Sequence, residues 1–143
     1  MTPGALKAAE RELLKFSKMD LDEIEVRKVY IDGEGRDHIT TTVVGDPSLP
    51  KMVLVHGYGG SGVLLYRLFK ELSQHYQIFA IDLLGMGSSS RPPFPCENGE
   101  QADLYCMDFM EKWRIAMGEL TGFVMVGHSY GGYISGTYAS KFP

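Results

Sequence analysis

The chain has 143 residues, of which 44% are hydrophobic and 22% charged, and its formal net charge is -4. This composition is typical of one globular domain and, without a run of Lys and Arg, it argues against nucleic acid as a partner. Cys96 and Cys106 are the two cysteines, too few for a zinc site or a disulfide framework, so we expect neither metal nor cofactor. The first twenty residues do not resemble a signal peptide, and no apolar run could span a bilayer. A cytoplasmic chain, or one bound peripherally to a membrane, is expected.

The N-terminal segment, residues 1–20, is predicted to contain a helix from Pro3 to Ser17. Apolar residues recur there at helical spacing, and they are Leu6, Ala9, Leu13 and Phe16. The simpler interpretation is a surface helix that packs on the domain through this stripe. A helix lying in a membrane interface is the alternative.

An antiparallel hairpin is predicted next. Residues 24–31 alternate in polarity, residues 32–35 contain turn-forming Asp and Gly, and residues 39–44 are β-branched throughout. This order of β-rich segment, turn and β-rich segment is typical of two adjacent strands.

From about residue 50 onward, the chain alternates strands and helices. Short apolar runs at 52–55, 77–81 and 123–126 read as strands buried on both faces. Helical stripes follow each of them, at 64–72, 106–117 and 130–141. This alternation predicts an α/β fold with a parallel sheet and flanking helices, in which residues 1–143 belong to one domain.

The motif with the clearest chemistry centres on Ser129, in the run Gly127-His128-Ser129-Tyr130-Gly131. A Gly-x-Ser-x-Gly match alone is weak evidence, but this one lies between a buried strand and a helix, where a nucleophile elbow must lie. Gly127, Gly131 and the following Gly132 would let the strand and the helix approach each other closely. We therefore predict that Ser129 is a nucleophile.

A second glycine-rich run, His56-Gly57-Tyr58-Gly59-Gly60-Ser61-Gly62, directly follows the strand at 52–55. In a hydrolase, such a loop turns one backbone N–H toward the negative charge that develops on the substrate. The backbone amides of Tyr58 and Tyr130 are the predicted oxyanion donors. The loop glycines involved are Gly57, Gly59 and Gly60. A phosphate-binding loop is disfavoured, because no Gly-Lys-Ser/Thr follows.

Neither a base nor an acid for Ser129 can be assigned. His56 and His128 lie inside the two glycine-rich loops, and each is expected to be a structural partner, with the His128 side chain on the side opposite Ser129. His38 and His75 are expected to be solvated. Asp82 precedes the serine, while the order in this chemistry is serine, acid, histidine, so Asp82 is better interpreted as a loop anchor. A serine without a base in hydrogen-bond reach is a poor nucleophile.

The two glycine-rich runs and the segment at residues 82–92, which begins with Asp82, together resemble the α/β-hydrolase superfamily. The segments at 91–95, 111–114 and 141–143 are similar to one lipid-handling subfamily, which includes an N-acyl-phosphatidylethanolamine lysophospholipase, a lipid-droplet lipase co-activator and lysophosphatidic-acid acyltransferase-like proteins. The resemblance implies a lipid acyl-ester substrate and a membrane or lipid-droplet surface. The co-activator carries asparagine where this chain has Ser129, so the match favours the catalytic branch. The acyltransferase motif His-x-x-x-x-Asp does not occur in these residues.

The resemblance also implies further strands, a lid, the acid and the histidine after Pro143. We therefore expect residues 1–143 to be the N-terminal portion of an α/β-hydrolase domain, with an exposed apolar edge strand and little activity alone. The expected function is hydrolysis of carboxylic esters of lipids, or a related acyl transfer, through an acyl-enzyme. The alternatives are a non-catalytic regulator that binds a lipase or a lipid surface, and a peptidase or epoxide-type hydrolase on the same fold.

Overall fold

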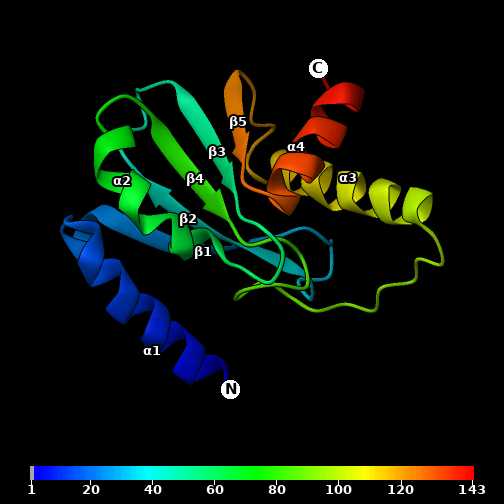
Figure 1. The fold of residues 1–143 in the computed structure, drawn as a ribbon, viewed down its shortest axis with the longest axis horizontal. Coiled ribbons are helices and arrows are strands. Elements are labelled where there is room, and N and C mark those ends of the chain that lie inside the picture. The colour runs from blue at the N-terminus through cyan, green and yellow to red at the C-terminus, as the bar shows by residue number, and fades with distance from the viewer. Residues whose placement is uncertain (1) are drawn as a thin grey trace.

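The computed structural model describes residues 2–143, so Met1, part of the predicted N-terminal segment, lies outside the described residues. One sheet and flanking helices make up this part of the chain (Figure 1). The strands are β1 (Ile24–Tyr30), β2 (His38–Val44), β3 (Lys51–Val55), β4 (Gln77–Ile81) and β5 (Phe123–Gly127). The helices are α1 (Pro3–Leu14), α2 (Tyr66–Leu72), α3 (Gly99–Ala116) and α4 (Tyr130–Lys141), with short 3-10 turns η1 (Lys15–Ser17), η2 (Leu21–Glu23) and η3 (Gly62–Leu65).

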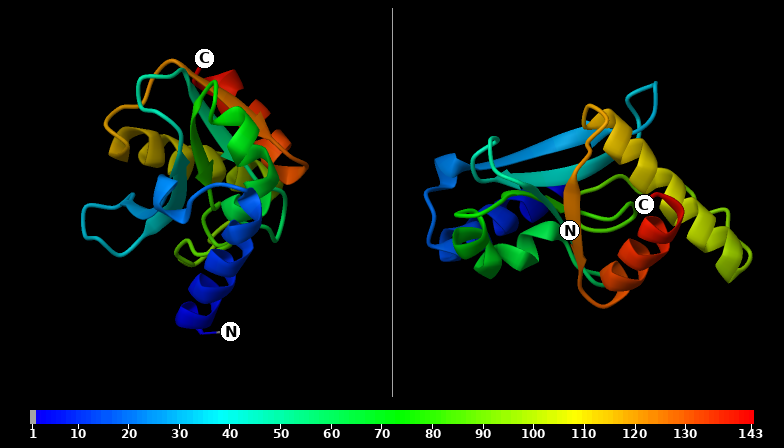
Figure 2. Two further views of the ribbon diagram at one scale, coloured as in Figure 1. Left: turned by 90° about the vertical axis from the view of Figure 1, so that its left-hand side faces the viewer. Right: turned by 90° about the horizontal axis from the view of Figure 1, so that it is seen from above.

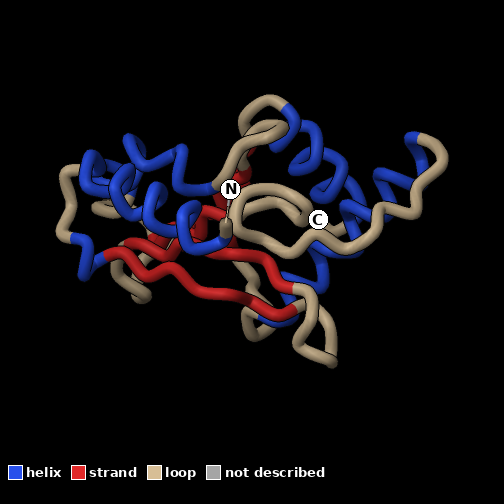
Figure 3. The backbone as a smooth tube through the Cα atoms, turned by 90° about the horizontal axis from the view of Figure 1, so that it is seen from below, coloured by secondary structure: helices blue, strands red, loops and turns tan. Residues whose placement is uncertain are grey.

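The sheet has the strand order β1-β2-β4-β3-β5. β1 and β2 form the expected antiparallel hairpin, and β2 also pairs antiparallel with β4. β3 pairs in parallel with both β4 and β5. The predicted fold class is therefore confirmed. The carboxyl ends of β3, β4 and β5 meet at one edge, so the loops that follow them lie together (Figure 3).

Two apolar cores lie on opposite faces of the sheet, because successive strand residues point to opposite sides. One core joins Phe69 of α2 and Leu14 of α1 to strand residues such as Met52. The other joins Trp113 of α3 and Ile134 of α4 to their own set of strand residues. Figure 2 shows the resulting arrangement from two further sides, with α1 close to α2 and α3 close to α4.

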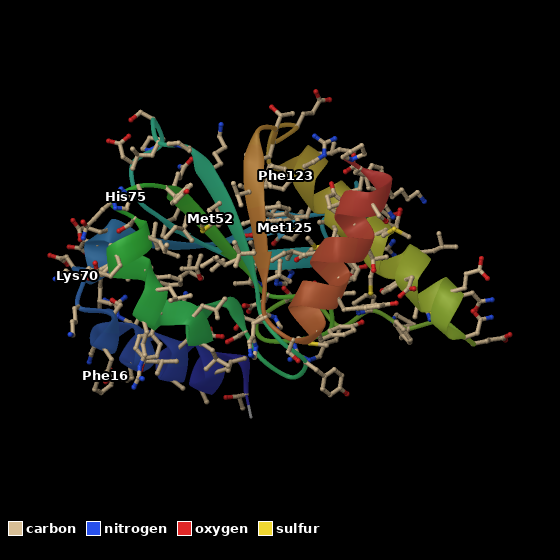
Figure 4. The ribbon with its side chains drawn as sticks, turned by 45° about the horizontal axis from the view of Figure 1, so that its top comes forward. Phe16, Met52, Lys70, His75, Phe123 and Met125 are labelled. Carbon is tan, nitrogen blue, oxygen red and sulfur yellow. The ribbon has the colours of Figure 1, made fainter. Side chains whose placement is uncertain are left out.

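The apolar stripe predicted for the first helix is wrong at one end. Phe16 is 69% exposed and projects from η1, whereas Leu14, which the stripe omitted, is buried (Figure 4). The chain tightens from an α-helix into a 3-10 turn at Lys15, and this tightening rotates the side chains that follow away from the α-helical stripe. Leu13 packs at the margin of the core, so the interpretation as a packed surface helix is confirmed.

The last strand lies at an edge of the sheet, as expected. Val124 and Val126 of β5 are 51% and 43% exposed. Phe123 and Met125 point the other way, toward α4 and the core beneath it (Figure 4). Such an uncovered edge is a place where another strand can add.

Candidate functional site

Ser129 adopts an unusual backbone conformation in the tight turn between β5 and α4. Its φ is 54° and its ψ is -120°, a combination that non-glycine residues rarely adopt and that costs about 1–3 kcal/mol. Flanking hydrogen bonds hold the turn. The amide of His128 donates to the carbonyl of Val55 at 3.0 Å, and the amide of Gly131 donates to the carbonyl of His128 at 2.9 Å. The side chain of Ser129 is exposed as a result.

Glycines allow the close approach of β5, α4 and β3 around this turn. A Cβ on Gly131 would overlap the carbonyl oxygens of Val55 and His56 and lie 2.7 Å from the carbonyl carbon of Val55. A Cβ on Gly127 would lie 2.5 Å from the amide nitrogen of Gly132. These are separations that real Cβ atoms do not show, so both positions require glycine. The first turn of α4 therefore sits directly on the end of β3.

The glycine-rich loop after β3 lies against Ser129. A Cβ on Gly57 would lie 3.2 Å from the Cβ of Ser129 and 3.2 Å from Nδ1 of His128. The rings of Tyr58 and Tyr130 meet edge to face, with centroids 6.2 Å apart. Within residues 2–143, neither Tyr58 nor Tyr130 uses its backbone N–H in a hydrogen bond of the turns, loops and caps.

His56 is a structural partner, as predicted. Its side chain is 1% exposed. Nδ1 donates to the carbonyl of Gly57 at 2.7 Å, and Nε2 accepts from the amide of Leu83 at 2.9 Å. Burial lowers the pKa of His56. The neutral ring therefore ties the loop after β3 to the loop after β4, and neither nitrogen is free to serve Ser129.

Asp82 anchors the same two loops, which confirms the prediction from sequence. One carboxylate oxygen accepts from the amide of Gly62 at 2.6 Å and the other from the amide of Ser88 at 2.7 Å. Gly87 has a φ of +51°, and a Cβ there would collide with this carboxylate. Asp82 is 2% exposed, so the bonds it accepts are shielded from water.

Two further contacts of the loop after β4 were not predicted. Glu10 of α1 accepts from the hydroxyl of Ser88 at 2.9 Å and 3.0 Å, which ties α1 to the loop after β4. His38, expected to be solvated, instead pairs with the hydroxyl of Ser90 at 2.8 Å and the carbonyl of Ser88 at 3.1 Å. Both contacts join residues at least fifty positions apart, so no local pattern could have revealed them.

The burial of Asp82 should make the stability of the fold depend on pH. Burial outweighs the two accepted hydrogen bonds and raises the pKa of Asp82. The folded chain therefore holds this proton more tightly than the unfolded chain, where aspartates titrate near about 3.9. The protonated carboxyl of Asp82 therefore contributes to the stability of the fold. This contribution is fully present below the unfolded-state pKa and is lost as the pH rises through the folded-state pKa. We expect the free energy of unfolding of the wild type, minus that of Asp82→Asn, to fall as the pH rises above about 4. Urea denaturation at a series of pH values measures this difference, and a rise with pH would contradict the assignment.

Residues for a metal are not brought together in the described part of the chain. Within residues 2–143, no group of three or more His, Cys, Asp and Glu side chains is arranged to hold an ion. Cys96 and Cys106 are free thiols, and Cys106 is buried.

Comparison with known proteins agrees with this geometry. A family model described as the alpha/beta hydrolase fold matches residues 50–143, which include both glycine-rich loops and Ser129. The chain belongs to the α/β-hydrolase fold family.

Curated relatives of this family member have lipid-related names. A 1-acylglycerol-3-phosphate O-acyltransferase of Arabidopsis thaliana is 41% identical over 110 residues, covering 77% of this chain and 26% of that protein. The 1-acylglycerol-3-phosphate O-acyltransferase ABHD5 of Mus musculus is 39% identical over 139 residues, covering 96% of this chain and 38% of that protein. The predicted resemblance is confirmed, and this α/β-hydrolase chain spans well under half the length of the curated relatives it matches.

Solved structures with the same fold include enzymes from bacteria. A membrane phospholipase A, described as a bacterial virulence factor, superposes with a TM-score of 0.72 at 25% identity, over 99% of this chain and 40% of that one. The carboxylesterase CesB of Bacillus subtilis superposes with a TM-score of 0.78 at 17% identity, over 97% of this chain and 45% of that one. The second likeness shows the fold alone.

Proposed function

We propose that this chain supplies the nucleophile and the oxyanion donors of a serine hydrolase that acts on carboxylic esters of lipids. The oxygen of Ser129 attacks the ester carbonyl, the alcohol leaves, and an acyl-enzyme forms that is then resolved by water. Resolution by the hydroxyl of a second lipid would make the same site an acyltransferase. The names of the acyltransferase relatives and of the membrane phospholipase support a lipid acyl ester as the substrate.

The observation that carries the proposal is the conformation of Ser129. Ser129 lies between a strand and a helix, and its backbone is strained at φ 54° and ψ -120°. Its side chain is exposed, so packing does not explain the strain. Strain of this kind is retained where the geometry serves the chemistry. In this case it turns the hydroxyl out of the sheet toward substrate.

The two backbone amides beside Ser129 are the proposed oxyanion hole. The N–H of Tyr130 belongs to the first turn of α4, where helical amides have no intrahelical acceptor. The N–H of Tyr58 comes from the loop that the His56 ring and the Asp82 carboxylate hold in place. Removing one such donor typically lowers the rate by about 10²–10³.

The general base and its acid are proposed to come from residues other than 2–143. Among the described histidines, His56 uses both ring nitrogens in structural hydrogen bonds, and His38 is bonded to Ser88 and Ser90. His75 precedes β4, at the end of the sheet opposite Ser129, and the exposed His128 makes none of the side-chain hydrogen bonds of residues 2–143. Residues 2–143 would then form the N-terminal part of one hydrolase domain. We expect these residues alone to react slowly or not at all.

Reaction with a fluorophosphonate probe tests this proposal. A longer form that carries the acid and the histidine should be labelled, and Ser129→Ala should abolish the labelling, whereas Ser140→Ala on the exposed side of α4 should not affect it. Residues 1–143 alone should show at most a small fraction of that rate, because no base assists the serine. Rapid Ser129-dependent turnover by residues 1–143 would contradict the proposed division of the triad.

The same experiment decides between the hydrolase and a non-catalytic regulator of a lipase. If the longer form resists labelling while it folds and binds lipid, the regulator is favoured. Serine at the turn, where a regulator has no need of a nucleophile, is the reason that we favour the enzyme.

We also propose that η1, at the end of the packed helix α1, and α2 meet a lipid surface. No helix within residues 2–143 has the length and apolar composition needed to cross a membrane, so any association would be peripheral. Phe16 and Leu68 are 69% and 45% exposed. Lys70 of α2 lies on the same side of the molecule as Phe16 (Figure 4). Exposed apolar side chains flanked by cations are typical of helices that lie on membranes.

A further inference from the structure

Three tyrosine rings lie in a row beside Ser129. We call Tyr58, Tyr130 and Tyr133 the tyrosine strip. The Tyr58 and Tyr130 rings meet edge to face at 6.2 Å between centroids, and the Tyr130 and Tyr133 rings are stacked at 6.3 Å with an interplanar angle of 16°. Tyr130 directly follows Ser129, and Tyr133 lies one helical turn further along α4.

Two rings of the strip are largely exposed, so they add little apolar burial to the core. Tyr58 is 83% exposed and Tyr133 is 53% exposed, although a buried aromatic ring is among the largest sources of apolar stabilisation. The face of an aromatic ring is negative and attracts cations. In the described part of the chain, the two cation–ring pairs are Arg67 with Tyr66 and Lys141 with Phe142, so neither uses the strip.

A carboxylate lies behind the strip without a cationic partner. The hydroxyl of Tyr133 donates to both oxygens of Asp103, at 2.8 Å and 2.7 Å. Within residues 2–143, the ion pairs do not include Asp103. Its hydrogen bond raises the pKa of Tyr133, and its charge contributes to the raised pKa of Tyr130, for which burial is the largest cause. The charge of Asp103 therefore acts on the two tyrosines of the strip that belong to α4.

The chain places few cations nearby to cancel this charge. Residues 92–111, which include the first half of α3, contain no Lys or Arg, and α4 has only Lys141, at its far end. The guanidinium of Arg91 donates to the carbonyls of Gly87 and Ser89. It lines a groove of about 420 Å³ with Gly59 and Gly60, which follow Tyr58, but the tyrosine rings and Asp103 do not line that groove. Electron-rich ring faces and an uncompensated carboxylate suit a cation and repel an anion.

We infer that the tyrosine strip and Asp103 form a subsite for a quaternary ammonium group on the lipid head. The inference rests on the proposed function, because it treats the strip as part of the substrate site around Ser129. Such a subsite would select choline-bearing lipids. Their trimethylammonium group would lie against the ring faces while the ester reaches Ser129. A lipid that ends in a phosphate monoester, which the names of the relatives specify for those proteins, finds no cation in the subsite.

Binding of two matched small molecules tests the inference without any turnover. The probes are choline and its carbon isostere 3,3-dimethylbutanol, in which a tert-butyl group replaces the trimethylammonium, so that only the positive charge differs. We expect choline to bind about tenfold more tightly, as expected for a partly desolvated cation–π site with a nearby carboxylate. NMR titration at millimolar concentration, followed through the tyrosine ring resonances, measures both affinities.

Variants separate the ring from the charge. Tyr133→Leu removes a ring face and Asp103→Asn removes the charge, so each should reduce the tenfold preference to about threefold or less. Tyr133→Phe keeps the ring and should retain most of the preference. Tyr30→Leu, which removes a similarly exposed tyrosine from β1, is the matched control and should change nothing.

Equal affinity for the two probes, or no binding of choline at millimolar concentration, would overturn the inference. A preference that survives in both Tyr133→Leu and Asp103→Asn would overturn it as well. Ser129→Ala should keep the preference, so the two proposals can fail separately. A longer form that binds choline selectively but resists the fluorophosphonate probe would contradict the hydrolase alone, and the reverse result would contradict this subsite alone.

Discussion

Replacing Gly131 by alanine is expected to destabilise the chain by at least about 3 kcal/mol, the upper range for overpacking a site that cannot relax. The added Cβ would overlap the carbonyl oxygens of Val55 and His56. Both are backbone atoms at the end of a central strand, so neither can move without disturbing the pairing of β3 with β4 and β5. The first turn of α4 would have to lift away from the sheet, and Ser129 would move with it. Urea denaturation followed by circular dichroism measures the loss.

Gly136→Ala in the same helix is the matched control. Nothing lies within 4 Å of a Cβ at that position, and alanine favours a helix over glycine by about 1 kcal/mol. We therefore expect Gly136→Ala to be neutral or stabilising. Equal effects of the two substitutions would show that helix propensity, and not the contact with β3, explains the requirement for glycine at Gly131.

Truncating Trp113 to alanine is expected to cost about 3–5 kcal/mol, as for other large buried aromatic side chains. Trp113 is fully buried beneath the sheet. Its Nε1 donates to the hydroxyl of Thr41 on β2 at 3.0 Å, so it also links α3 to the hairpin side of the sheet. Since Trp113 is the one tryptophan of the chain, circular dichroism is the appropriate probe of unfolding.

Two further substitutions separate the causes of that loss. Trp113→Phe keeps most of the apolar volume but breaks the bond to Thr41, and it should cost about 1–3 kcal/mol. Leu104→Ala, at a 48% exposed position of the same helix, should stay within about 0.5 kcal/mol of the wild type. A loss for Trp113→Ala no larger than that for Leu104→Ala would contradict the role of Trp113 in the core.

The elements of the fold could be predicted from the sequence because their signals are local. Alternating polarity at residues 24–31 and the apolar run at residues 52–55 each lie within one strand, and β1 and β3 form there. The run around Ser129 combines the end of a strand, turn glycines and the start of a helix in about ten residues, so the tight turn could also be predicted. The prediction failed where a helix changed type, at Phe16, because the stripe assumes one constant period.

Contacts between distant segments of the chain could not be predicted in the same way. The contact of Glu10 with Ser88 and that of Trp113 with Thr41 join residues 78 and 72 positions apart. Contacts over such separations depend on strand order, and no local pattern specifies that β4 lies between β2 and β3.

The sequence by itself determined that Ser129 occupies a glycine-flanked turn between a strand and a helix, because the five-residue run from Gly127 to Gly131 is enough to encode such a turn. Only the tertiary structure decided what that turn faces. Parallel pairing of β3 with β5 brings the loop of Tyr58 against Ser129, and the packing of α3 on α4 brings Asp103 to Tyr133. Long-range packing therefore determines much of what lies around the candidate nucleophile, since Tyr58 and Asp103 come from segments distant in the chain, whereas Tyr130 and Tyr133 follow Ser129 directly.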